Sequence, residues 1–310
     1  MTDLILHHYA TSPFSEKVRL IFGYKGLAWK SVRVPVMLPK PDVAALTGGY
    51  RRTPFLQIGA DIYCDTALMC RVIERIAPQP TLYPVAAGGA AHFLALWADT
   101  AFFWGAVPYI MQPAGIAHIM AGTSDEHLKA FAADRAAMTA GMRRANTVNA
   151  RAHLTTYLGW LDQQFADGRK FLCGDVACIA DFSFAHVIWF IRRAPPIATV
   201  LAPYPKLAGW YERVDAFGQG RPEPLGSDEA IAIARAAGGT VAVAVDPGQG
   251  FEAGEAVTVT PIDYAQDPVA GRLVGLTQDE AAVERIDDRA GRVVVHFPRI
   301  GFQVKKDAVQ

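Results

Sequence analysis

The sequence has no excess of either charge. Its 30 Lys and Arg residues are matched by 30 Asp and Glu residues, and its pI is about 7.1. A protein that binds nucleic acid or an anionic membrane needs a positive surface field, so the composition argues against both partners. Residues 226–310 hold 13 acidic and 8 basic residues, which makes this part least suited to phosphate backbones.

Long apolar runs are also lacking. No uninterrupted run reaches the roughly 18 residues of a membrane span, because Asp99 interrupts the longest candidate. Residues 1–12 have neither the basic start nor the apolar stretch of a signal peptide. These absences predict a cytoplasmic protein with no membrane segment.

Cysteines are few and are not spaced as metal ligands or as a redox pair. Cys64, Cys70, Cys173 and Cys178 lie in apolar segments without the C-x-x-C spacing of a zinc site or a dithiol. The eight histidines show no ligand spacing either. We therefore predict buried, reduced thiols and no metal site.

The pattern of apolar and polar residues divides the chain into three parts. Residues 1–80 alternate strand and helix patterns in the order βαβαββα, which is typical of an α/β unit. Residues 86–220 show helical periodicity almost throughout, which predicts an all-α domain. After a Gly- and Pro-rich linker at Gly218–Gly226, residues 226–310 read as one short helix and several short strands, the first at Val241–Val245. This pattern predicts a small β-rich, barrel-like domain.

The segment Ser12-Pro13-Phe14-Ser15 predicts a helix that begins at Pro13 beneath an anion site. Proline fits the first helical position, which places Ser12 at the N-cap. Free backbone N–H groups and the positive end of the helix dipole then face whatever lies above Ser12. An ordinary N-cap is the alternative role of Ser12, and one oxygen can serve both purposes.

In this motif and several others the chain resembles the glutathione transferase (GST) family, over about residues 4–217. The motifs are Ser12-Pro13-Phe14-Ser15, Arg52-Thr53-Pro54-Phe55, Asp65-Thr66, Ile179-Ala180-Asp181 and Tyr204-Pro205-Lys206-Leu207. The resemblance implies a thioredoxin-like N-terminal domain that binds glutathione as a co-substrate, an all-helical GST C-terminal-type domain, and a homodimer. The β-rich domain, which we expect to be an SH3-like barrel, lies outside the resemblance, and its role is open.

The resemblance assigns glutathione contacts to the turn before Phe55. The proline that matches Pro54 is cis in the family, and the backbone of Thr53 would pair with the cysteinyl part of glutathione. Arg51 and Arg52 would meet the glycyl carboxylate, and solvated surface arginines are the alternative.

The resemblance also assigns the γ-glutamyl end of glutathione to Asp65 and Thr66, where Glu and Ser are more common in the family. The Asp65 carboxylate would meet the ligand ammonium, while the Thr66 hydroxyl and the helix N-terminal amides would meet its carboxylate. A purely structural N-cap is the alternative for Asp65.

Ser12 and Ser15 stand where glutaredoxin-like relatives have the two cysteines of a C-P-x-C motif. A hydroxyl cannot form a mixed disulfide, so dithiol exchange by this motif is excluded. A hydroxyl can instead donate to a bound thiolate. With the helix terminus, this supplies the ~2.7 kcal/mol that lowers a thiol pKa by about two units. GST subclasses differ in the residue that contacts sulfur, so Ser12, Thr11 and Tyr9 are all candidates for the catalytic role.

We therefore expect an enzyme that activates glutathione for attack on a small electrophile. The electrophile is expected between residues 11–14 and the aromatic residues Phe102, Phe103, Trp104 and Tyr109. The alternative is a non-catalytic protein that keeps the fold while its C-terminal domain binds a protein partner.

Overall fold

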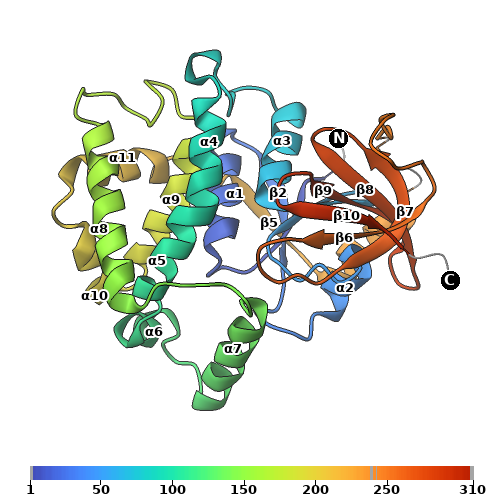
Figure 1. Ribbon diagram of the computed structural model, residues 1–310, viewed down its shortest axis with the longest axis horizontal. Helices are drawn as coiled ribbons and strands as arrows, with labels where there is room; N and C mark the ends of the chain where they lie inside the picture. Colours follow the sequence, from blue (N-terminus) through green and yellow to red (C-terminus); the bar gives the residue numbers. More distant parts are fainter. Residues whose placement is uncertain (1–2, 238–239, 242, 308–310) are drawn as a thin grey trace.

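The computed structural model describes residues 3–237, 240–241 and 243–307 (Figure 1). Its N-terminal unit has the predicted order βαβαββα. The elements are β1 (Ile5–His8), α1 (Pro13–Tyr24), β2 (Ala28–Arg33), α2 (Pro41–Thr47), β3 (Phe55–Ile58), β4 (Asp61–Cys64) and α3 (Thr66–Ile76). Strand β1 pairs in parallel with β2 and antiparallel with β3, which gives the expected thioredoxin fold.

The second part is all-helical, as predicted. Its elements are η1 (Val85–Ala87), α4 (Ala90–Trp97), η2 (Ala98–Phe102), α5 (Phe103–Ile110), α6 (Pro113–Ile119), α7 (Asp125–Met138), α8 (Thr147–Gln164), α9 (Ile179–Arg192), α10 (Pro195–Ala198), η3 (Thr199–Leu201) and α11 (Pro205–Asp215). Helix α9 is buried along nearly its whole length, between α1 on one side and α4 and α5 on the other. The η2 segment is a single π-helical turn that joins α4 to α5.

One helical run, Ala90–Ile110, is long and apolar enough to cross a membrane by length and composition alone. However, Asp99 in this run forms an ion pair with the buried Lys17, and Phe102 is completely buried. Part of the run therefore packs in the hydrophobic core, and 39% of its most apolar window is buried.

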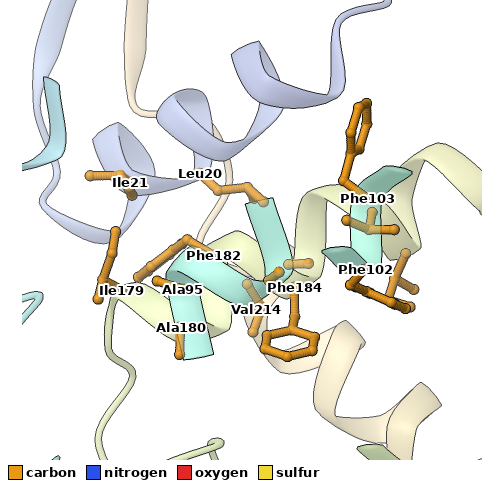
Figure 2. Close-up of a cluster of buried hydrophobic side chains, with 14 of the residues drawn as sticks. Leu20, Ile21, Ala95, Phe102, Phe103, Ile179, Ala180, Phe182, Phe184 and Val214 are labelled. Carbon is orange, nitrogen blue, oxygen red and sulfur yellow. The ribbon is translucent and has the colours of Figure 1, made fainter. Parts of the chain in front are cut away.

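The thioredoxin unit and the helical domain share one hydrophobic core. Figure 2 shows Leu20 and Ile21 of α1 in the same cluster as Phe102 and Phe182 of the helical domain. All four side chains are at most 1% exposed. The seam between the two domains is therefore firmly packed, and a site built along it has fixed walls.

Residues 221–306 extend the thioredoxin sheet at both of its edges. The elements are β5 (Arg221–Leu225), α12 (Ser227–Ala236), β6 (Ala256–Pro261), β7 (Val269–Leu276), β8 (Glu280–Asp287), β9 (Gly291–Pro298) and β10 (Phe302–Lys306). Strand β9 pairs in parallel with β4, and β5 pairs in parallel with β2. The described strands thus form one ten-stranded sheet in the order β10-β6-β7-β8-β9-β4-β3-β1-β2-β5.

The β-rich C-terminal region is confirmed, and it lies on the opposite side of the thioredoxin unit from the helical domain (Figure 1). Part of the expected linker Gly218–Gly226 is strand β5, whose prolines are tolerated because it is an edge strand. The strand expected at Val241–Val245 includes residue 242, which lies outside the described residues, and Val245 forms a bridge to Leu276. The SH3-like barrel and the domain limits stay predictions.

Candidate functional site

The chain enters helix α1 as the sequence predicts. Pro13 is the first helical residue, and the Oγ of the N-cap Ser12 accepts the backbone N–H of Ser15 at 3.2 Å. Because the Ser12 oxygen accepts here, its own proton stays available for a ligand. Tyr9, Thr11 and Ser12 all line one cavity of about 610 Å³, which we call the large chamber.

A second cavity of about 270 Å³, the small chamber, is lined by Thr53, Pro54, Asp65 and Thr66. The Thr53–Pro54 peptide bond is cis. Asp65 caps α3 by accepting the N–H of Ala67 at 2.8 Å. Burial raises the pKa of Asp65 above its ordinary value. The cavity therefore disfavours the free charge and favours a cationic partner for it.

The two chambers meet. Phe14, Arg52, Thr53 and Tyr264 line both of them. The start of α1, the turn at Thr53 and the start of α3 thus border two adjoining chambers.

The large chamber has apolar walls, mostly from the helical domain, and its lining includes several basic side chains. Of the four aromatic residues expected there, Phe103 and Trp104 line it, whereas Phe102 and Tyr109 are core residues that line neither chamber. The other apolar wall residues come mostly from α5, α6 and α7. They include Val107, Pro108, Met111, Ile116, Ile119, Phe131, Ala132 and Met138. None of the described residues that line this chamber is acidic.

Arg51 and Arg52, both expected to contact the glycyl carboxylate of glutathione, are engaged in ion pairs. Arg51 pairs with Asp134 of α7, and Arg52 pairs with Asp263 in the loop between β6 and β7. The Arg52 guanidinium also lies 3.8 Å from the centre of the Tyr264 ring. The charges of both guanidinium groups are therefore largely neutralised by carboxylates, and these ion pairs hold the walls of the two chambers in place.

Lys40, which was not predicted from the sequence, is a buried cation of the large chamber beside Arg51 and Arg52. Its Nζ donates to Thr53 Oγ1 and to the Arg51 carbonyl oxygen, each at 3.2 Å. Burial, together with the nearby Arg135 and Arg51, lowers the pKa of Lys40 to about 8. Its flanking prolines at the start of α2 were the only sequence signal of a fixed position.

A buried polar cluster at the wall of the small chamber was likewise not predicted from the sequence. Lys17 Nζ lies 2.5 Å from Asp99 Oδ2 and 3.5 Å from Thr66 Oγ1. His186 Nε2 lies 3.0 Å from Asp99 Oδ1. Although burial acts in the opposite direction, Lys17 and His186 lower the pKa of Asp99, so the carboxylate stays charged. Among the residues that the structure describes, no group of three or more His, Cys, Asp or Glu side chains could hold a metal ion.

A thioredoxin unit followed by an all-helical domain, with a two-chambered hollow at their seam, defines the class of GST-fold proteins. Two family models match the chain and indicate the same class of protein. The model for the glutathione S-transferase N-terminal domain matches residues 6–81, and the model for the C-terminal domain matches residues 125–213. No curated protein matches the chain.

The similarity to one solved structure extends over the β-rich region as well. A GST-like protein from Pseudomonas syringae is 40% identical, with 99% of this chain and 100% of that chain covered, at a TM-score of 0.82. The chain belongs to the glutathione S-transferase family. Two more distant structures share the fold over a smaller part of this chain. A glutathione S-transferase from Rhodospirillum rubrum is 20% identical, covering 69% of this chain and 88% of its own, with a TM-score of 0.54. A beta-etherase from a Sphingobium species is 16% identical, covering 70% and 96%, with a TM-score of 0.53.

Proposed function

We propose that this protein binds glutathione across the two chambers and activates its thiol for attack on a small electrophile in the large chamber. The observation that carries the proposal is the meeting of the chambers at Thr53 and Phe14, beside the N-terminus of α1. A bound thiol at this junction has amide donors on one side and an apolar cavity on the other. That arrangement both stabilises a thiolate and admits an uncharged acceptor.

Each end of glutathione has a partner in this arrangement. The γ-glutamyl ammonium meets Asp65, and the adjoining carboxylate meets Thr66 and the first amides of α3. The cysteinyl backbone pairs with Thr53. The glycyl carboxylate meets Lys40, because Arg51 and Arg52 already have carboxylate partners. These contacts leave the sulfur beside Ser12 and Thr11.

The chemistry needs only modest help from the protein. A thiol of pKa about 8.5 is a few per cent thiolate at neutral pH. A hydroxyl donor and the helix terminus raise the thiolate fraction by about twentyfold to thirtyfold, and the released proton goes to solvent. The sulfur then forms a bond to the electrophilic carbon, whose leaving group departs with the bonding electron pair. Proximity in the joined chambers supplies the remaining acceleration.

Glutathione titration by calorimetry, followed by a conjugation assay with chlorodinitrobenzene, tests the proposal. We expect a dissociation constant in roughly the micromolar to millimolar range, together with turnover. If glutathione fails to bind at several millimolar, the proposal is wrong, and a non-catalytic protein whose β-rich region engages a partner is favoured. We also propose a homodimer in solution and a cytoplasmic location, which light scattering and cell fractionation test.

Variants of Ser12 identify the thiol contact. Ser12→Ala and Ser12→Gly should each lower kcat/KM about twentyfold near pH 6.5, because both remove the donor to sulfur. The alanine costs about 1 kcal/mol of stability as a lost cap and the glycine only a few tenths, so equal rate losses exclude a folding effect. Ser15→Ala is the control, because its buried hydroxyl lines neither chamber. Wild-type rates in both Ser12 variants, with a loss in Thr11→Val, would transfer the role to Thr11.

A further inference from the structure

The loop between β6 and β7 reaches from the β-rich region to the helical domain. On one side, Asp263 forms an ion pair with Arg52, which also donates to the carbonyl oxygen of Tyr264. On the other side, the N–H of Ala265 donates to the carbonyl oxygen of Met138, the last residue of α7, at 2.7 Å. The middle of the loop is thus anchored to the thioredoxin unit on one side and to the helical domain on the other.

The side chain of Tyr264 occupies the span between these anchors. Its ring lies 3.8 Å from the Arg52 guanidinium on one side, and its centre is 4.8 Å from that of the Trp104 indole on the other. It is one of the four residues that line both chambers, and the only one of them that the β-rich region contributes. Burial raises the pKa of Tyr264 to about 12, so its phenol stays protonated at neutral pH.

From this placement we propose that Tyr264 is a specificity-determining residue, a wall between the two chambers that limits the size of the group attached to the glutathione sulfur. The inference rests on the proposed function and assigns to the β-rich region a part in the site. The ring acts by its volume. A smaller side chain at this position widens the passage between the chambers, and a larger one narrows it.

Binding of glutathione conjugates tests the wall without requiring turnover. We compare the dissociation constants of S-methylglutathione and S-naphthylmethylglutathione by calorimetry. Tyr264→Ala should shift their ratio about tenfold in favour of the naphthylmethyl conjugate, as expected when a pocket gains apolar room. Tyr264→Phe, which keeps the ring, should leave the ratio unchanged. Tyr264→Trp should shift it in the opposite direction and keeps the inference testable if the alanine variant does not fold.

The matched control is Ile262→Ala, two residues earlier in the same loop. Ile262 is 59% exposed and lines neither chamber, so this variant should keep the wild-type ratio. An unchanged ratio in both the alanine and tryptophan variants, with wild-type protein that binds both conjugates, overturns the role of Tyr264 alone. Failure of the wild-type protein to bind either conjugate overturns the proposed function as well.

Discussion

At the scale of single residues, Asp65 stands in a backbone conformation that a side chain rarely adopts. Its φ is 71° and its ψ is 134°, immediately before the first turn of α3. Such strain costs on the order of 1–3 kcal/mol and persists where the surroundings enforce it, often at a ligand site. Here the strained backbone brings the carboxylate to the wall of the small chamber, where burial raises its pKa.

Replacing Asp65 with glycine or alanine separates its strain from its binding role. We expect both variants to raise the dissociation constant for glutathione about tenfold or more, because a charge-assisted hydrogen bond to the ammonium is lost. Glycine accepts the positive φ, so Asp65→Gly should be about 1 kcal/mol more stable than Asp65→Ala. Calorimetry and denaturant unfolding measure the two quantities. Unchanged glutathione affinity in both variants would reduce Asp65 to a structural cap.

A second feature at the scale of single residues is the ammonium of Lys40, whose pKa is lowered to about 8. Its ammonium is present below that pH and is lost as the pH rises through it. If Lys40 holds the glycyl carboxylate, binding of S-methylglutathione, which has no thiol to titrate, should weaken between about pH 7 and pH 9.5. Lys40→Arg keeps its charge over this range and should show a smaller change. The amino group of the ligand titrates in both experiments, so equal pH profiles would exclude Lys40 from the contact.

At the scale of elements, helix α1 is tied to the helical domain by an ion pair that a π-turn positions. The extra residue of a π-turn redirects the side chains within it, and here it brings Asp99 towards Lys17 of α1. Asp99 also accepts from Ser183 Oγ at 3.3 Å and contacts His186. The pair lies in the shared core beside the small chamber, so the same contact holds both the domain seam and the chamber wall.

Asp99→Asn should be strongly destabilising. It leaves the Lys17 ammonium, whose side chain is 1% exposed, without its counter-charge. Loss of one partner of a buried pair typically costs about 3–5 kcal/mol. The double variant Lys17→Met with Asp99→Leu should recover more than half of that loss, as measured by urea unfolding. A cost near the ~0.5 kcal/mol of an exposed pair would show that solvent reaches the site.

At the scale of the whole molecule, the β-rich region is held to the thioredoxin unit by the parallel pairing of β9 with β4. His296 lies at this junction, with Nε2 2.9 Å from Asp61 Oδ1 and Nδ1 2.6 Å from Glu280 Oε1. Its ring also stacks on that of Tyr63 at 4.5 Å. Burial opposes the charged form, yet Asp61 and Glu280 outweigh it and raise the pKa of His296.

The junction should make stability depend on pH. Because the folded pKa is raised, the stabilisation is complete below the ordinary value of 6.5 and is lost as the pH rises through the folded value. We therefore expect the melting temperature of the wild-type protein to fall as the pH is raised above 6.5. His296→Gln should be less stable at pH 6, by about 3–5 kcal/mol, and should show a flatter profile. Parallel profiles for the two proteins would contradict a charged His296 at the junction.

The candidate site was predictable where short motifs define it. Ser12 with Pro13, the turn at Thr53 and the start of α3 at Asp65 are each local signals, and the structure brings them together. Lys40 and Tyr264 were not predictable, because each reaches the chambers only through contacts with distant segments. The burial of a lysine and the insertion of a loop are decided by packing, which one segment does not encode.

The sequence by itself determined the three-part organisation, the βαβαββα order and the helix that begins at Pro13, because capping, periodicity and turn chemistry act over a few neighbouring residues. Only the tertiary structure decided that β9 would pair with β4, that Asp99 would meet Lys17, and that Tyr264 would line both chambers. An open sheet edge offers the same backbone donors and acceptors to any strand. The choice of partner therefore depends on the whole buried surface around it.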